Sequence, residues 1–226
     1  MKNPAPATAK ARVLVVGRSP SVLVAAVELM RSKGYRADVT NQFDRVLDDY
    51  HPSDLDVVVF GGMVPTDTKQ HLRDEITRGN PGVTIVQGLA GIPGVIAAQV
   101  DSVTRGCSTD DAEIGYDPEN RAVRVTLPHA AQATIETLWM TSWRPPEPTS
   151  TSAVVFDDEL AGGSHAIAIP DRIPTEGSFA TVTVGTQVSV FAIGPMPTAV
   201  TRMVPKSSAD TRLPAVPAIT THRDES

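Results

Sequence analysis

Apolar residues follow two different periods along the chain, and the change of period divides the protein into two parts. In residues 12–106, continuous apolar runs alternate with segments whose apolar residues recur every three to four positions. The second part is expected at residues 107–193, and from residue 112 its apolar and polar residues alternate one by one, as in strands with one buried face. Residues 1–11 and 194–226 show no consistent period, which predicts a flexible N-terminus and a Pro-rich tail with few lasting contacts. The alternative for the tail is a path along a sheet edge.

The first part predicts four β–α units. The expected strands are RVLVVG, YRADVT, DVVVF and VTIVQG. Ser19 and Pro20 mark the start of the first helix, and Gly34 marks its end. In the last helix, residues 93–105, we expect an inward face of Ile96, Val100 and Val103. Four such units in about 95 residues indicate an α/β fold, an open parallel sheet flanked by helices.

The third helix of this part has a candidate start signal of its own. Asp67 and Gln70 have the three-residue spacing of a capping box, in which two side chains bond the first free N–H groups of a helix. We therefore expect Asp67 and Gln70 to cap this helix, and Leu72 and Ile76 to form its buried side.

The second part predicts seven strands. RAVRVTL is the clearest of them, because it places Val123, Val125 and Leu127 on one face. Gly185-Thr186 has the composition of a two-residue type II′ hairpin turn. This pattern resembles immunoglobulin-like and fibronectin-like domains and predicts a C-terminal all-β sandwich. Cys107 is the single cysteine, so the sandwich would have no disulfide.

Composition excludes several classes of partner. The formal net charge is −6 and only 4% of residues are aromatic, so we expect neither a basic nucleic-acid surface nor a base-stacking platform. The five histidines show no metal-ligand spacing, and we expect no metal site. The N-terminus lacks the apolar core of a signal peptide, and no apolar run approaches the roughly 18 residues that span a bilayer. These features predict a cytoplasmic protein that does not contact a membrane.

The first part resembles a receiver domain of the flavodoxin-like class over roughly residues 12–100. The resemblance rests on VLVVG, GYRADVT and DLDVVVFGGMVP. It implies an acidic pair after the first strand, an Asp nucleophile after the third, a hydroxyl after the fourth and a Lys after a fifth. Gly17 and Arg18 stand at the acidic pair, and Gly61 stands at the nucleophile. The resemblance therefore implies a pseudo-receiver without catalytic residues.

A second resemblance connects the same strands to Rossmann-type dinucleotide-binding domains. VLVVGRSP and DVVVFGG carry it, although the family's G-x-G-x-x-G loop is represented by Gly17 alone. The Tyr-x-x-x-Lys pair of short-chain dehydrogenases is absent. This resemblance implies the alternative function of a nucleotide- or NAD(P)-binding protein related to oxidoreductases.

Both resemblances place a candidate site at the carboxyl ends of the strands, where ligands bind in open α/β sheets. A helix N-terminus and the Arg18 guanidinium favour an anion there, such as the phosphate of a nucleotide, and glycines allow close approach of a ligand. No cofactor is required by the sequence. The candidate binding residues are Gly17, Arg18, Ser19, Ser21, Gly61, Gly62, Gln87 and Gly88.

These residues also have a purely structural explanation. Ser19 and Pro20 suit the start of a helix, the glycines suit a turn, and Arg18 suits a solvated surface. With catalytic groups missing, the sequence favours a regulatory or interaction protein that binds a protein partner or forms a homodimer.

Overall fold

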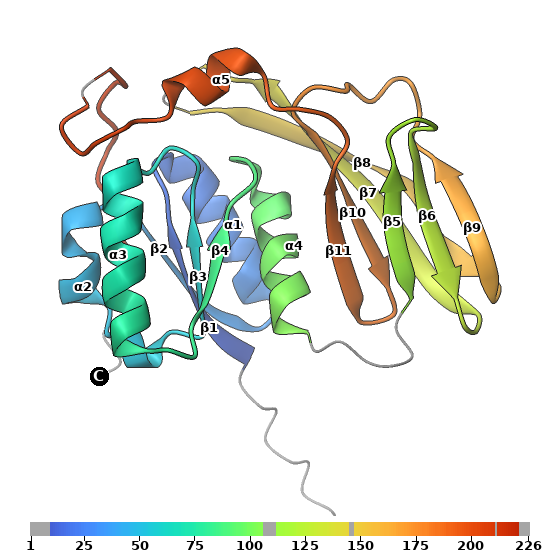
Figure 1. Cartoon of the computed structure of the whole chain (residues 1–226), viewed down its shortest axis with the longest axis horizontal. Helices are drawn as coiled ribbons and strands as arrows, with labels where there is room; N and C mark the ends of the chain where they lie inside the picture. Colours follow the sequence, from blue (N-terminus) through green and yellow to red (C-terminus); the bar gives the residue numbers. More distant parts are fainter. Residues whose placement is uncertain (1–9, 106–111, 145–146, 211, 222–226) are drawn as a thin grey trace, which may run out of the picture.

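The computed structural model describes residues 10–105, 112–144, 147–210 and 212–221. The predicted boundary between residues 106 and 107, with Cys107, lies outside the described residues. Figure 1 shows the layers in order: α2 and α3, a parallel sheet, α1 and α4, and then two antiparallel sheets. The candidate site lies at the carboxyl edge of the parallel sheet, which is the upper edge in this view.

The parallel sheet has four strands in the order β2-β1-β3-β4. Its strands are β1 (Lys10–Val16), β2 (Tyr35–Thr40), β3 (Val57–Phe60) and β4 (Thr84–Gln87). β1 pairs in parallel with both β2 and β3, so the chain changes direction across the sheet at β1. The first strand begins two residues before the predicted boundary at residue 12.

Continuous apolar runs form these strands because both faces of the sheet are covered. Val13 and Val15 pack into a core with α1 and α4. Leu14 and Val16 point to the opposite core, which α2 and α3 complete. The prediction of an open parallel sheet flanked by helices is confirmed.

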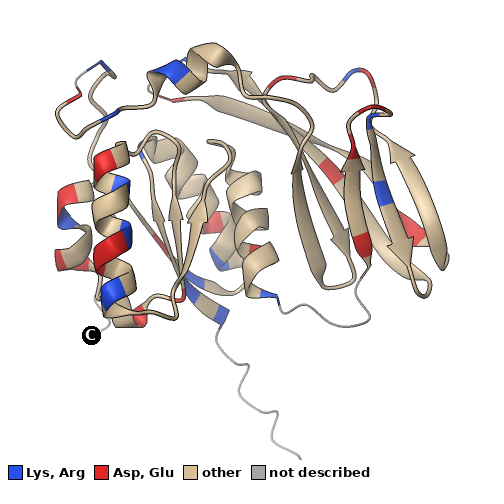
Figure 2. Ribbon diagram, viewed as in Figure 1, with Lys and Arg blue, Asp and Glu red and all other residues tan. Residues whose placement is uncertain are grey.

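The helices of this part lie close to their predicted positions. They are α1 (Pro20–Ser32), the 3₁₀ turn η1 (Phe43–Arg45), α2 (Val46–Asp49), the 3₁₀ turn η2 (Pro52–Asp54), α3 (Thr66–Gly79) and α4 (Pro93–Thr104). Gly34 follows α1 with φ of +88°, a conformation that glycine adopts at little cost, so the predicted end of this helix is confirmed. Figure 2 shows acidic and basic residues interspersed along α2 and α3, as expected for helices with one face toward solvent.

The predicted capping box of α3 is wrong. The helix begins at Thr66, and the residue before it is Pro65, which makes no side-chain cap bond. Asp67 accepts a hydrogen bond from the Thr68 backbone N–H at 2.6 Å, and Gln70 donates to Asp74 at 2.9 Å. Asp67 is the second residue of the helix, so its side chain does not stand at the N-cap position that a capping box requires. The other oxygen of Asp67 accepts from the Ser208 N–H in the C-terminal segment at 3.2 Å.

In the part of the chain that the structure describes, seven further strands form two antiparallel sheets. They are β5 (Glu113–Asp117), β6 (Ala122–Leu127), β7 (Ala131–Ser142), β8 (Thr149–Leu160), β9 (Gly163–Ala168), β10 (Ser178–Val184) and β11 (Gln187–Ala192). Their orders are β11-β10-β7-β8 and β5-β6-β9. Val123, Val125 and Leu127 lie together in one hydrophobic core with residues of β7 and β10, as their spacing predicts. Gly185 has φ of +57° between β10 and β11, consistent with a glycine-first hairpin turn.

Helix α4 is covered on two sides. Ile96 and Val100 pack toward the parallel sheet, whereas Val95 packs with Leu138 and Phe179 of the four-stranded antiparallel sheet. The expectation that Val103 faces inward is wrong, since it is 43% exposed. The antiparallel sheet therefore has helix on one face and the second antiparallel sheet on the other.

The C-terminal segment returns over the parallel sheet. It contains α5 (Thr198–Met203), which lies above the carboxyl ends of the strands in Figure 1. Further on, Thr220 forms an antiparallel bridge with Thr40 of β2. The Thr221 N–H donates to the Val39 carbonyl at 3.0 Å. The tail thus follows a sheet edge, the second of the two paths that the sequence allowed.

The close packing of α4 gives a test of this arrangement. A β-carbon at Gly94 would lie 2.5 Å from Leu138 Cδ2, so we expect Gly94→Ala to lower the free energy of unfolding by about 1–3 kcal/mol through overpacking. Urea denaturation measures this change. In a Leu138→Ala background the added methyl group has room, and the loss caused by Gly94→Ala should shrink or reverse. An equal loss in both backgrounds would contradict the contact.

Candidate functional site

The candidate site lies where the strand order reverses, beyond the carboxyl ends of β1 and β3. Two loops border it, residues 17–19 after β1 and residues 61–63 after β3. They are held together by backbone, because the Gly61 N–H donates to the Val16 carbonyl at 2.8 Å. This position is the one at which open α/β sheets bind ligands.

Five of the eight predicted binding residues line one cavity at this position, and three do not. The five are Gly17, Arg18, Ser19, Gly61 and Gly62, whereas the remaining three are Ser21, Gln87 and Gly88. Gln87 and Gly88 instead bond the end of β3: the Gln87 side chain and the Gly88 N–H each donate to the Phe60 carbonyl at 2.9 Å.

The glycines at this edge of the sheet allow the backbones of neighbouring loops and strand ends to approach each other closely. A β-carbon on Gly61 would lie 3.3 Å from the Cα of Gly17, and one on Gly88 would lie 3.2 Å from the Phe60 carbonyl oxygen. Both distances are shorter than ordinary van der Waals contact. Only Gly62 of this group has open space around its missing β-carbon. Gly61 is therefore explained by the convergence of β1 and β3, and Gly62 is the glycine that leaves room in the cavity.

The N-terminus of α1 already has an anion beside it. Ser19 occupies the N-cap position but makes no side-chain cap bond. The carboxylate of Glu147, which precedes β8, accepts hydrogen bonds from the Ser21 N–H at 3.3 Å and from the Ser21 hydroxyl. A carboxylate at this end of a helix is stabilised by the free N–H groups and by the helix dipole. The structure thus places a side chain of the protein where the sequence predicts a ligand phosphate.

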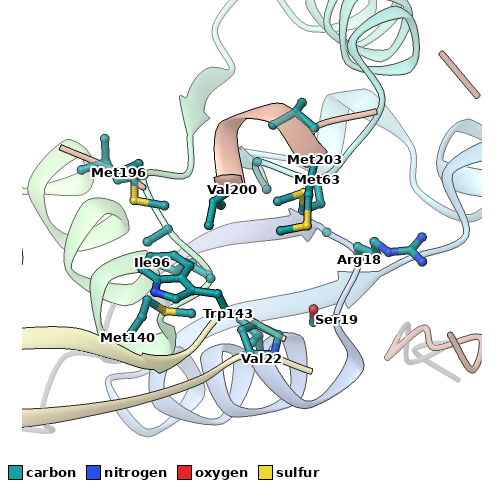
Figure 3. A pocket seen from close by; sticks show the side chains of 18 of the residues that line it. Arg18, Ser19, Val22, Met63, Ile96, Met140, Trp143, Met196, Val200 and Met203 are labelled. Carbon is teal, nitrogen blue, oxygen red and sulfur yellow. The ribbon is translucent and has the colours of Figure 1, made fainter. Parts of the chain in front are cut away.

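Arg18 also has a partner within the chain. Its guanidinium donates to the carbonyl of Pro214 in the C-terminal segment. Partial burial lowers the pKa of Arg18 below its usual value, because the charged form loses hydration. Arginine nevertheless stays protonated at neutral pH. In Figure 3 its head group points away from the interior of the cavity.

Apart from Thr201, the other side chains known to line the cavity are apolar. Sequence analysis missed its lining because the residues come from distant segments, and none belongs to a local motif. The additional side chains include Val22, Met63, Ile96, Met140, Trp143, Met196, Val200 and Met203. Figure 3 shows them arranged around one space below α5. Met196 and Met203 could have indicated that the tail packs against the rest of the protein, because exposed tails rarely carry large apolar side chains.

The described residues contain side chains of the types that bind metal ions. In residues 10–105, 112–144, 147–210 and 212–221, His, Cys, Asp and Glu side chains form no group of three that could hold a metal ion. Among these same residues, no helix is both long enough and apolar enough to cross a bilayer.

Comparisons with known proteins give no family for this chain. No family model matches it, and no curated protein matches it. Among solved structures, a β-glucosidase from Listeria innocua in complex with gluconolactone is 10% identical, with 86% of this chain and 47% of that chain covered and a TM-score of 0.31. β-Glucosidase 3B from Thermotoga neapolitana in complex with glycerol is 10% identical, with 84% and 51% covered and a TM-score of 0.27. The chain spans about half the length of these structures.

The carboxylate at the start of α1 can be tested through stability. We expect Glu147→Ala to lower the free energy of unfolding by about 1 kcal/mol, because the first N–H groups of α1 lose their acceptor. Urea denaturation measures the change. Glu28→Ala is the matched control: Glu28 is exposed on the same helix, and its loss should leave stability unchanged or slightly higher. Equal effects of the two variants would show that Glu147 does not stabilise α1.

Proposed function

We propose that this chain is a non-catalytic regulatory or protein-interaction protein with a receiver-like α/β part that accepts no phosphate. The chemistry of the crevice between β1 and β3 carries the proposal. Gly17, Arg18 and Gly61 stand where the receiver resemblance requires carboxylates. A phosphoryl acceptor needs a nucleophilic oxygen, and magnesium needs oxygen ligands. None of these three side chains supplies either.

The strand order supports the receiver-like alternative over the Rossmann-like one. β1 lies between β2 and β3, which matches the first four positions of the flavodoxin-like order 2-1-3-4-5. In the Rossmann order, β1 would lie between β2 and β4 instead. The anion positions at Arg18 and at the start of α1 are taken by Pro214 and Glu147. A nucleotide-binding or NAD(P)-dependent role therefore has less support.

The proposal includes an immunoglobulin-like or fibronectin-like sandwich, made by the two antiparallel sheets, as the interaction module. Its open edge supports this role. Within the described residues, β8 pairs on one side only, with β7, and residues 149–154 carry no charge. Val154 is 56% exposed there. Unpaired strand edges without charges are templates for pairing with another chain.

A second copy of the chain is the partner that this edge fits best. In a two-fold antiparallel pair centred on Ser152, each Ser152 faces its counterpart and Ser150 faces Val154. The acidic residues 157–159 of each copy lie beyond the segment 149–155 that pairs. Glu147, which stands opposite Asp157 in this register, is bonded to Ser21 of its own chain. The proposed assembly is a homodimer through β8.

We expect the purified protein to be a dimer in native mass spectrometry. Ser152→Lys and Ser152→Glu should each shift it to monomer, because like charges would then face each other across the two-fold axis. Mixing the two variants should restore a dimer that contains one copy of each. A monomeric wild-type protein, or dimers of both single variants, would contradict the β8 interface.

The loss of receiver chemistry has a direct test. Incubation with acetyl phosphate and magnesium should add no phosphate to the protein, as followed by intact-mass spectrometry, while a competent receiver domain treated in parallel becomes phosphorylated. The reason is the missing carboxylate at Gly61 and the missing acidic pair at Gly17 and Arg18. Phosphorylation of any Asp would overturn the proposal of a pseudo-receiver.

A further inference from the structure

The partly open cavity at the strand ends is lined by three parts of the chain that lie far apart in sequence. Its volume is about 250 Å³. The loops after β1 and β3 form the floor, Met140 and Trp143 at the end of β7 form a wall, and Val200 of α5 lies above. Figure 3 shows these side chains converging on one space. The cavity is therefore a product of the complete fold.

The lining offers almost nothing to a polar ligand. Among the described residues that line it, Arg18 is the one charged side chain, and that guanidinium donates to Pro214 outside the space. Ser19 and Thr201 supply the hydroxyl groups, and the remaining side chains are apolar. A buried water needs two to four polar partners, so such a lining holds water poorly. The chemistry of the lining favours an uncharged, apolar occupant.

Methionine and tryptophan give the cavity a preference for aromatic rings. Four of the six methionines of the chain line it: Met63, Met140, Met196 and Met203. Thioethers are polarisable, adapt to irregular shapes and make favourable contacts with ring edges. The indole of Trp143 adds a flat face on which a ring can stack. These residues come from three separate segments of the chain, and Met140, Trp143 and Met196 also pack in one hydrophobic cluster with Leu138 and Phe179.

We propose that this cavity binds a small neutral aromatic molecule of one or two rings. An apolar cavity of about 150 Å³ holds benzene, whereas drug-sized ligands occupy roughly 300 Å³ or more. The volume of this cavity lies between these values. Helix α5 has one buried residue, Val200, and local opening of so lightly packed an element gives the ligand a path of entry. The site is independent of the pseudo-receiver proposal, since it requires no group from receiver chemistry.

Trp143 permits a direct measurement. The chain has two tryptophans, and Trp139 packs in the core between the antiparallel sheets, away from the cavity. In a Trp139→Phe protein, 1-bromonaphthalene should quench Trp143 fluorescence in a saturable manner, because bromine quenches an indole at contact distance. In a Trp143→Phe protein, the remaining Trp139 should show no saturable quenching. The melting temperature of the wild-type protein should rise with the concentration of the probe.

A variant whose cavity is filled by a larger side chain tests whether the probe binds there. Val200→Phe places a ring in the space and should weaken binding of the probe at least tenfold, while Val103→Phe makes the same change at an exposed position outside it and should leave binding unchanged. Circular dichroism checks that both variants are folded; if Val200→Phe is not, the comparison of the two tryptophan variants decides. The absence of saturable quenching, equal quenching of both tryptophans, or tighter binding of 4-bromo-1-naphthoate would overturn the proposal of a neutral aromatic ligand.

Discussion

Packing of α4 on two sides is the interaction on which the rest of the structure depends. Ile96 and Val100 contact the parallel sheet, and Val95 contacts Leu138 of the four-stranded antiparallel sheet. Gly94, Ala97 and Ala98 keep the helix thin enough for both layers to approach. Because this helix belongs to two cores, it fixes where the end of β7 lies relative to the strand ends of the parallel sheet. That position brings Trp143 and Glu147 to the crevice.

The crevice is consequently occupied by groups of the chain itself. Glu147 supplies an anion to α1, Pro214 supplies an acceptor to Arg18, and α5 lies over the strand ends. An anionic ligand would have to displace bonds that already satisfy these groups. An apolar ligand could occupy the space between these groups without displacing any of these bonds. The site that the sequence indicated for phosphate thus has, in the folded chain, the chemistry of a hydrophobic cavity.

The local sequence pattern was sufficient to predict most of the helices and strands, but not where each one ends or which face it buries. The four β–α units and seven further strands follow from the periodicity of apolar residues and from Pro and Gly residues at the ends of elements. Gly34, which ends α1, is an example. The capping box at Asp67 is wrong because the helix already begins at Thr66, and the carboxylate of Asp67 instead accepts from Ser208, a residue more than a hundred positions away. The prediction that Val103 faces inward is wrong because the periodicity of a helix that packs on two sides does not define a single inward face. In both cases tertiary contacts outweighed a weak local preference.

The sequence by itself determined the alternation of strands and helices, the switch to period two, and the lack of carboxylates at Gly17, Arg18 and Gly61. These are local properties, set by the spacing of apolar residues and by the identity of single side chains. Only the tertiary structure decided what fills the crevice. The decisive contacts join residues 126 positions apart, at Ser21 and Glu147, and 196 positions apart, at Arg18 and Pro214. The periodicity of apolar residues cannot predict such pairs, because the packing of the helix and sheet layers determines which distant residues meet.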